Sequence, residues 1–350
     1  MASPIQHDQN PSGASRQRHA VLRVIAWIGA ALALVVALAC GALMAVLNTN
    51  RGHRYLLGLV QRKASDALGA RVQIENLTPH LATLSADLYG IRISGAAPIT
   101  NPPLLEVDHL AVGVRVVSLL HRTRYLDNVQ IDHPVAWIVV DKNGRSNLPV
   151  PEQSGSSHTD LFQLGIRHAQ ISRGELYYNS RPHAISADLH DLAFDSIFSA
   201  PLTRYSGSLA YSQGKLIVGT FRPLQHDLKV EFAATPQGFT VKQGTVTAGP
   251  SHATVSATIE NFSNPVVQAK YDVVLDGDQA AQILNEPTIP SGSVLLSGGL
   301  HYQESANQSA LQSLAIDGSL SSAGFAMNTS TARTRIANLW AHYSLADGNA

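Results

Sequence analysis

From residue 71 onward, one short segment after another alternates apolar and polar side chains, and this pattern restricts the possible folds more than any other feature. Leu228, Val230 and Phe232, for example, alternate with Lys229 and Glu231. Successive side chains of a strand point to opposite faces, so a period of two predicts strands that are apolar on one face only. One-sided strands of this kind are typical of antiparallel sheets. The sequence therefore predicts a mainly β fold.

The pattern leaves open how the apolar side of such a sheet is covered. Residues 51–69 have helical spacing and predict an amphipathic helix, which either caps the first strands or lies in a membrane surface. After them we expect only one helical turn, at residues 278–284. The sheet must therefore fold on itself as a sandwich or barrel, or curl into a trough whose apolar inside faces another molecule.

Gly, Pro and Asp residues mark the expected turns of the β region. We expect turns at residues 132–134, 172–174, 213–215 and 236–238. A stretch rich in Pro, Ser and Gly, residues 149–160, predicts a linker or loop. It separates a first β segment, residues 71–148, from a second, residues 161–350. We expect the second segment to be truncated, because its last residues have the composition of a turn with no strand after it.

An apolar stretch precedes the β region. Residues 24–47 carry no formal charge, and their 24 residues would span about 36 Å as a helix, against about 30 Å for the core of a bilayer. We predict a transmembrane helix over residues 21–47 behind a disordered polar tail, residues 1–20. Cleavage as a signal peptide, or as a lipoprotein at Cys40, is the alternative. Lys and Arg on both flanks leave the orientation open.

Composition and motifs argue against several classes of function. Charged residues make up 14% of the chain, and 25 Lys and Arg balance 25 Asp and Glu, so we expect no nucleic-acid partner. One cysteine cannot form a disulfide framework. Ser212 and Lys215 have the Ser-x-x-Lys spacing, but they lie in an expected turn and not on the helix that this chemistry requires. We predict that the protein is not an enzyme and uses no cofactor.

Four nearby side chains have the chemistry of metal ligands, namely His183, Asp188, His190 and Asp191. Strand alternation would send His190 and Asp191 to opposite faces of the sheet. A solvated strand edge is therefore the simpler interpretation, and we predict no metal site.

The order of several short phrases resembles a known family. Leu-Gly-Ala-Arg-Val-Gln-Ile-Glu-Asn-Leu at residues 68–77 follows the apolar stretch, and Leu-Asp-Asn-Val-Gln-Ile-Asp-His-Pro stands at residues 126–134. Asp-Lys-Asn-Gly-Arg-Ser-Asn-Leu-Pro follows at residues 141–149. Further phrases stand at residues 103–110, 118–120, 166–178 and 259–265. In this order, over residues 21–275, the chain is similar to the N-terminal part of the AsmA-like family and closest to its TamB branch.

The resemblance implies a single-pass inner-membrane anchor with the β-domain in the periplasm of a Gram-negative cell. It also implies a repetitive, curled antiparallel sheet, a taco-like groove with an apolar interior. Members of the family are associated with phospholipid movement between the inner and outer membranes and with cell-envelope biogenesis. The TamB branch adds an outer-membrane barrel protein as a partner. This chain is much shorter than members of that branch and shows no counterpart of their C-terminal domain, which again suggests truncation.

Two functions remain, and they use the sheet differently. In the first, the protein is a lipid conduit whose acyl chains lie along the apolar side. The candidate lining residues are Val112, Val114, Leu228, Val230, Phe232, Val255, Ala257, Val273 and Leu275. In the second, the sheet is a scaffold that offers an edge to an outer-membrane strand by β-augmentation, in outer-membrane protein assembly or autotransporter secretion. An open apolar face favours the first function, and a closed face with a free edge is compatible with the second.

Overall fold

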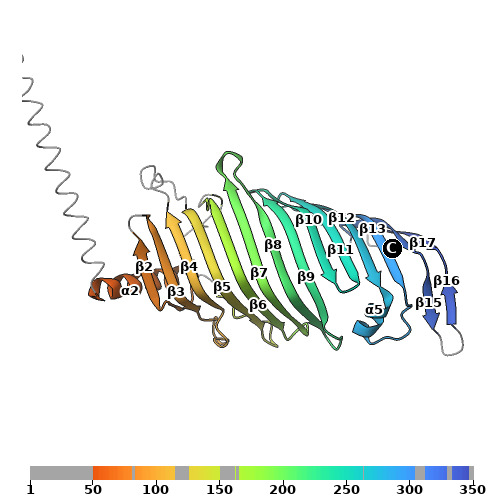
Figure 1. The fold of residues 1–350 in the computed structure, drawn as a ribbon, viewed down its shortest axis with the longest axis horizontal. Helices are drawn as coiled ribbons and strands as arrows, with labels where there is room; N and C mark the ends of the chain where they lie inside the picture. Colours follow the sequence, from red (N-terminus) through yellow and green to blue (C-terminus); the bar gives the residue numbers. More distant parts are fainter. Residues whose placement is uncertain are drawn as a thin grey trace, which may run out of the picture. The chain divides into compact units, whose positions relative to one another are not determined.

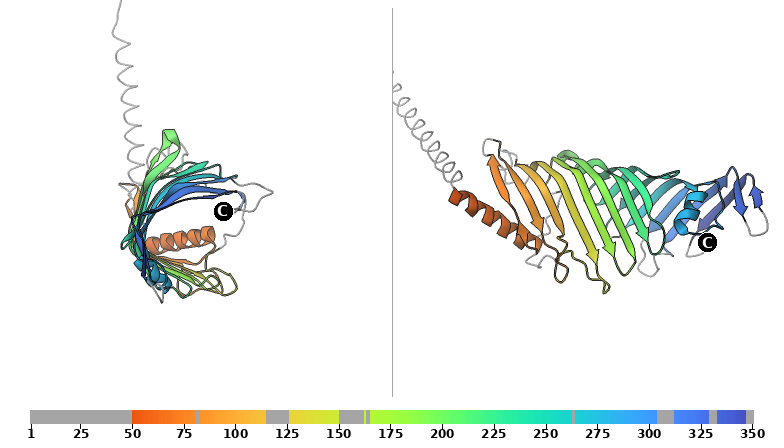
Figure 2. Two further views of the ribbon diagram at one scale, coloured as in Figure 1. Left: turned by 90° about the vertical axis from the view of Figure 1, so that its right-hand side faces the viewer. Right: turned by 60° about the horizontal axis from the view of Figure 1, so that its bottom comes forward.

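The computed structural model describes residues 50–80, 83–114, 126–149, 162, 165–262, 264–303, 312–328 and 333–346. It is mainly β, with 64% strand, and it contains one curled, unclosed mixed sheet of 15 strands (Figure 1). The predicted β class is therefore confirmed. The chain divides into two units, residues 1–60 and 61–350, and the sheet belongs to the second. In Figure 2, left, its strands arch around a central space that opens on one side.

The strands are long for a globular protein, and several exceed ten residues. The elements of the first half are α2 (Asn50–Leu68), β1 (Val72–Gln73), β2 (Asn76–His80), β3 (Ser85–Ile93), β4 (Leu105–Val114), β5 (Leu126–Val140), β6 (His168–Ser180), β7 (Ile185–Ser199), η1 (Ala200–Leu202) and β8 (Arg204–Val218). Those of the second half are β9 (Leu224–Ala234), β10 (Gly238–Ala248), β11 (Ser251–Glu260), β12 (Val266–Asp276), α5 (Gly277–Leu284), β13 (Ser293–Gln303), β14 (Leu314–Ser322), β15 (Phe325–Asn328), β16 (Arg333–Ile336) and β17 (Leu339–Leu345).

Neighbours in the chain are neighbours in the sheet almost throughout. The order is β1-β3-β4-β5-β6-β7-β8-β9-β10-β11-β12-β13-β14-β17, with β2 also paired to β3, while β15 and β16 form a separate hairpin. The pair β5–β6 is parallel, so the expectation of a fully antiparallel sheet is wrong at this point. A parallel pair needs a connection of roughly a dozen residues or more, and residues 141–167 supply one. The two predicted β segments meet at this pair in one sheet.

Several predicted segments lie wholly or largely outside the described residues. These are the tail at residues 1–20, the transmembrane helix at residues 21–47, and the linker at residues 149–160 except Pro149.

A search of the described residues finds no helix with both the length and the apolarity needed to cross a bilayer.

The helix α2 covers the region predicted as amphipathic. Its residues 61–68 belong to the same unit as the sheet and are tied to the first strands. Gln61 Nε2 donates a hydrogen bond to the carbonyl of Ile74 at 2.9 Å, and Ser65 Oγ accepts one from the Val72 amide at 2.9 Å. Gly69, with φ of 63°, follows the helix and lets the chain turn into β1. The predicted helical turn near residue 278 is also present, as α5.

Three of the four predicted turns are irregularities inside long strands. β5, β6 and β8 continue through residues 132–134, 172–174 and 213–215, where His133, Arg173 and Gln213 have φ of 49°, 54° and 54°. The register of the sheet shifts at the last two positions. Bulges and turns both favour Gly, Pro or a residue with positive φ, so the local signal does not distinguish them. The fourth prediction is confirmed, because the Thr235 amide donates to the Gly238 carbonyl at 2.8 Å between β9 and β10.

The bulges keep the apolar side chains on one face. β9 contains no bulge, so Leu224 and Leu228, an even number of residues apart, lie on the same side of it. They pair with Leu216 and Tyr211 of β8, which are an odd number of residues apart because Gln213 lies in the bulge between them. Without the extra residue, one half of β8 would turn its apolar side chains to the other face.

An ion pair links β5 and β6 beside the bulge. Arg173 Nε and Ser172 Oγ donate to Asp132 Oδ1 at 3.0 and 2.9 Å. The hydrogen bond from Arg173, followed by that from Ser172, lowers the pKa of Asp132 to about 2. The charged carboxylate is therefore favoured by the folded chain.

The lowered pKa of Asp132 predicts that the stability of the folded chain depends on pH. The folded pKa of this carboxylate lies below the unfolded value of roughly 3.9, so its contribution is complete above about pH 4 and is lost as the pH falls through about 2. We expect Asp132→Asn to lower the urea midpoint of the full chain at neutral pH, and this difference to shrink as the pH falls to about 2 and to vanish below it. Circular dichroism in detergent micelles across that range measures it.

Asp272→Asn is the control, since Asp272 lies on an exposed position of β12 and has no ion pair within the described residues. A difference for Asp132→Asn that is the same at all pH values would contradict the assignment.

Candidate functional site

The apolar face of the sheet is built from cross-strand rows. Residues paired directly across a ladder point to the same face, so a row can be followed from strand to strand. The first row contains Pro79, Ala86, Val112, Val129, Ala169, Ser196, Gly207, Phe232, Val241, Ala257, Ala269, Leu300, Ile316 and Leu345. Ser196 is its one hydrogen-bonding side chain. The row thus runs almost without polar interruption from β2 to β17.

A second row lies next to the first on the same face. It contains Leu77, Leu88, Leu110, Ile131, Ile171, Phe194, Leu209, Val230, Gly244, Val255, Tyr271, Gly298, Gly318 and Tyr343. Three glycines and two tyrosines gather at its β10–β17 end. Two rows that each cross the whole sheet make the apolar face one continuous surface.

The structure places eight of the nine candidate lining residues on this face. Val112, Phe232 and Ala257 belong to the first row, and Val230 and Val255 to the second. Three further positions follow from the same register: Leu228 and Val273 lie on a third row with Val246 and Ala253, and Leu275 stands two residues beyond Val273. For Val114 the structure describes only the backbone pairing with Leu126 at the end of β4.

Most of this face is only half-buried. Phe232 is 8% exposed, whereas Val255 and Leu275 are 38% and 47% exposed. The buried apolar side chains among the described residues are Val72, Ile74, Leu77, Ile91, Val107, Phe232 and Ala248. Five of these seven lie between residues 72 and 107, at the β1–β4 end of the sheet. The packed core is therefore small and local, and the rest of the apolar face is accessible.

Aromatic stacking surrounds the buried Phe232 in the middle of the face. The Phe232 ring stacks on Phe194 and on Phe239, with 5.7 Å between ring centroids in each pair. Stacked aromatic pairs of this geometry are favourable beyond the area they bury. The three rings join β7, β9 and β10 across the apolar face.

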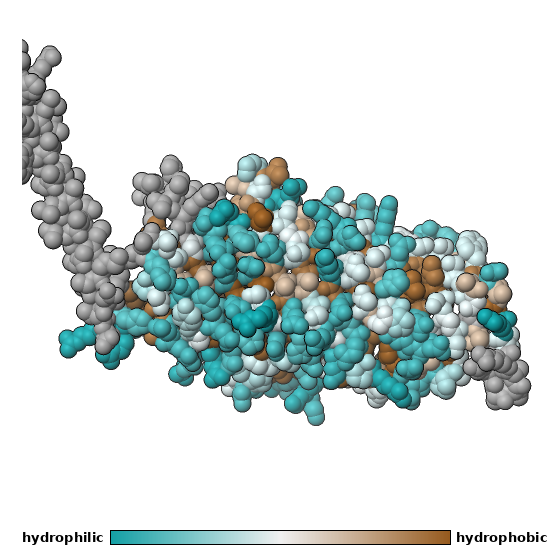
Figure 3. All heavy atoms as spheres, in the orientation of Figure 1, coloured by the Kyte–Doolittle hydropathy of each residue, from teal (hydrophilic) through white to brown (hydrophobic). Residues whose placement is uncertain are grey.

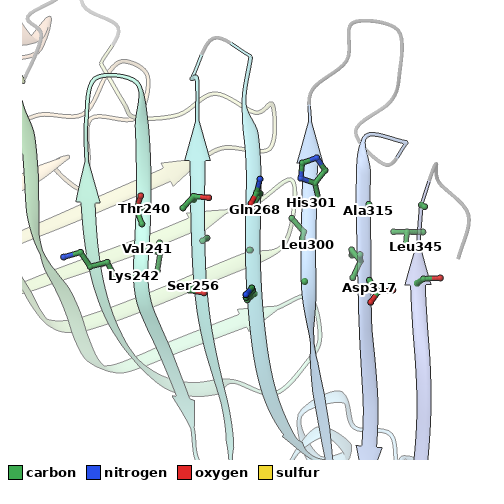
Figure 4. Close-up of a pocket in the computed structure, with 18 residues that line it drawn as sticks. Thr240, Val241, Lys242, Ser256, Gln268, Leu300, His301, Ala315, Asp317 and Leu345 are labelled. Carbon is green, nitrogen blue, oxygen red and sulfur yellow. The ribbon is translucent and has the colours of Figure 1, made fainter.

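Two hollows lie on the apolar face in the second half of the sheet. The larger, about 790 Å³, follows the first row over β10–β17 and includes Val241, Leu300 and Leu345 (Figure 4). The smaller, about 310 Å³, lies between the sheet and α5, where Val246 and Val273 face Ile283. Neither hollow shares a lining residue with the other.

The helix α5 is held at the edge of the smaller hollow by polar contacts. Asp276 caps its N-terminus by accepting a hydrogen bond from the Gln279 amide at 2.8 Å. Gln279 Nε2 in turn donates to the Ala248 carbonyl of β10 at 2.7 Å, and Ser251 Oγ accepts from the Asp276 amide at 3.0 Å. These bonds fix the helix while its apolar side chains face the sheet.

The opposite face of the sheet is polar, and hydrophilic residues dominate the side shown in Figure 3. Histidine–carboxylate pairs are frequent, as in Asp87, whose carboxylate oxygens lie 2.7 Å from His80 and 3.0 Å from His109. Burial acts to raise the pKa of Asp87, but the hydrogen bonds of His109 and His80 hold it below its usual value. Charged and polar groups therefore keep this face in contact with water.

The residues singled out for catalysis or metal binding lie in other contacts. Ser212 Oγ donates to Asp191 Oδ2 at 3.0 Å, and His183 Nδ1 lies 3.0 Å from Ser180 Oγ. His190 meets the Tyr177 ring edge-on. No group of three His, Cys, Asp or Glu side chains in the described residues is arranged to hold a metal ion.

Sequence reasoning missed the features that depend on register. Tyr271 and Tyr343 are 72 residues apart in sequence, yet their hydroxyl oxygens lie 2.7 Å apart. The rows likewise cross bulges that break the period of two. Alternation within one strand carries no signal for either feature.

Comparison of the chain with known proteins yields no matching family model and no matching curated protein.

Val255 and Phe232 differ in exposure, so we expect substitutions at these two apolar positions to cost different amounts of unfolding free energy. We expect Val255→Thr to cost less than about 1 kcal/mol of unfolding free energy, because its side chain is partly in water and threonine is a good strand former. Phe232→Ala should cost about 3 kcal/mol or more, because it leaves a cavity among the stacked rings. Urea unfolding of both variants measures the contrast. Equal costs would mean that the face is covered.

Proposed function

We propose that this chain is a membrane-anchored β-trough protein of the AsmA/TamB type, which binds phospholipid and conducts it between the inner and outer membranes for envelope biogenesis. In this proposal residues 21–47 anchor it in the inner membrane, and the sheet lies in the periplasm. The protein acts as a carrier surface and catalyses no reaction.

The observation that supports the proposal is the accessible apolar face. A sheet closed onto its own core would bury most of its apolar side chains, whereas here Val255 and Leu275 remain more than a third exposed. An apolar surface of this extent on a soluble domain normally meets another apolar molecule. Acyl chains fit this requirement, because each buried methylene contributes about 0.8 kcal/mol without any specific pocket.

The rows also suit movement along the sheet. The strand path of fourteen members, at about 4.8 Å spacing, is about 60 Å long. One acyl chain, which spans half of a roughly 30 Å bilayer core, covers about three strand spacings. The face therefore offers successive, similar and shallow positions, and a lipid can leave one as it enters the next.

A free edge supports the scaffold as the second candidate. β17 pairs with β14 on one side and with no described strand on the other. Trp340 of β17 is 69% exposed. A strand of an outer-membrane protein could extend the sheet at this edge by β-augmentation.

Photo-crosslinking tests the conduit against the scaffold. We expect benzoylphenylalanine at Phe232 or Val255 of the full chain, mixed in detergent with phosphatidylethanolamine, to capture phospholipid. The same crosslinker at Lys229 or Glu231, on the opposite face, should capture little. Mass spectrometry of the adducts measures the ratio. Equal labelling at all four positions, or none, would reject the conduit, and capture of an outer-membrane strand at Trp340 would support the scaffold.

A charge in the first row should block lipid binding. Lysine at Ala257 would place an ammonium group in the larger hollow, where it must lose water or exclude the acyl chain. We expect Ala257→Lys to retain about tenfold less phospholipid after purification. Thr254→Lys is the matched control, because Thr254 lies on the same strand, pairs with Asp272 on the opposite face and lines neither hollow. Equal retention by the two variants would argue against lipid on the apolar face.

A further inference from the structure

Two tyrosines form a bridge across the floor of the trough near its β17 end. Tyr271 of β12 and Tyr343 of β17 belong to the second row, and their hydroxyl oxygens lie 2.7 Å apart. Between them in the same row stand Gly298 of β13 and Gly318 of β14. The two side chains thus reach toward each other over two intervening strands.

The intervening glycines make this arrangement possible. A Cβ atom on Gly298 would lie 2.6 Å from the Tyr271 hydroxyl, and one on Gly318 would lie 2.5 Å from the Tyr343 hydroxyl. Both distances are below van der Waals contact. The rings can therefore lie low across the sheet only where these two strands carry no side chain.

The Tyr271 end of the bridge stands between the two hollows on β12. The larger hollow contains Ala269 and Leu300, which belong to the first row, and the smaller contains Val273, which lies on the other side of the second row on β12. No residue of the second row lines either hollow. Positions two residues apart along a strand are about 6.8 Å apart, so on β12 the Tyr271 side chain lies between the larger hollow at Ala269 and the smaller hollow at Val273.

The bridge also brings hydrogen-bonding capacity to an apolar floor. Two hydroxyls together have two donors, and their mutual bond uses one of them. Neither hydroxyl has another partner within the described residues. Burial, and then the hydrogen bond to Tyr343, raise the pKa of Tyr271 to about 12, so its hydroxyl remains protonated at neutral pH. One O–H donor is thus available to a ligand between the two hollows.

We infer that the Tyr271–Tyr343 bridge divides the trough into two acyl lanes, so that the lipid bound here carries two chains, one in each hollow, with an ester oxygen at the tyrosine hydroxyls. This inference rests on the proposed lipid-binding function and specifies its ligand. A single-chain amphiphile would fill one hollow and leave the other to water. A two-chain ester lipid places its branch point, where its polar atoms lie, over the bridge.

Crosslinkers in both lanes test the division. Benzoylphenylalanine replaces both Ala269 and Val273 in the full chain, which is mixed in detergent with dioleoyl phosphatidylethanolamine and irradiated. Lys270 lies between the two positions, so trypsin places them on separate peptides that only a shared lipid can join. We expect peptide pairs joined through one diacyl lipid, and only singly labelled peptides with the monoacyl form.

Removing the hydroxyls tests the polar contact. The double variant Tyr271→Phe with Tyr343→Phe keeps both rings and loses the donor. We expect about fivefold weaker binding of the diester lipid, the effect of one neutral hydrogen bond, and less than a twofold change for the dialkyl ether analogue, which has no ester carbonyl. Tyr302→Phe, on the same face of β13, is the matched control and should bind both lipids as the unchanged chain does. A merely structural bridge would weaken both lipids equally.

The outcomes separate this inference from the function on which it rests. Binding of diacyl lipid that never joins the two peptides, or monoacyl lipid that does, would overturn the two lanes and leave the lipid trough intact. Equal losses for ester and ether lipids would overturn the contact with the hydroxyls. If neither lipid binds or crosslinks, the proposed lipid-binding function fails, and the two-lane arrangement fails with it.

Discussion

The cross-strand register is the constraint on which the rest of this structure depends. It aligns residues of successive strands, most of them apolar, into rows that cross the sheet, as from Val112 through Phe232 to Leu345. Where the alternation of apolar and polar residues is interrupted in a strand, the apolar side chains would otherwise lie on both faces of the sheet. The bulge at Gln213 restores the correct side by adding one residue, and the same strands gain the bend and twist that bulges produce. Curvature and a one-sided apolar face thus have a common origin.

Most of the buried apolar side chains that the structure describes lie at the first strands of this sheet, so the later strands add little to the packed core. Val72, Leu77 and Val107 are buried at the first strands, whereas later strands leave their apolar side chains half-exposed. The stability of those later strands must come mainly from ladder hydrogen bonds and from neighbouring side chains within each row. The polar face, with pairs such as Asp132 and Arg173, stays hydrated. In the proposed function, a lipid covers this exposed apolar face.

The apolar face is nevertheless not uniform. Over most of its length the rows offer similar aliphatic positions, which suits a ligand that slides. Near β17 the Tyr271 and Tyr343 hydroxyls interrupt this surface between two hollows. α5, held by Gln279, covers one of the hollows from the side. A lipid on this sheet would therefore meet shallow, repeated contacts first and a more defined position near the end.

The sequence by itself determined the β class, the one-sided apolarity of the strands, α5 and the hairpin at Thr235, because each depends on side chains a few residues apart. It also identified candidate lining residues such as Val230 and Val255, since alternation marks one side of a strand. Only the tertiary structure decided that His133, Arg173 and Gln213 lie in continuous strands and not in turns. The same holds for the parallel pair β5–β6 and the meeting of Tyr271 with Tyr343. These features depend on which strand pairs with which, and in what register, and that choice is made between residues far apart in the chain.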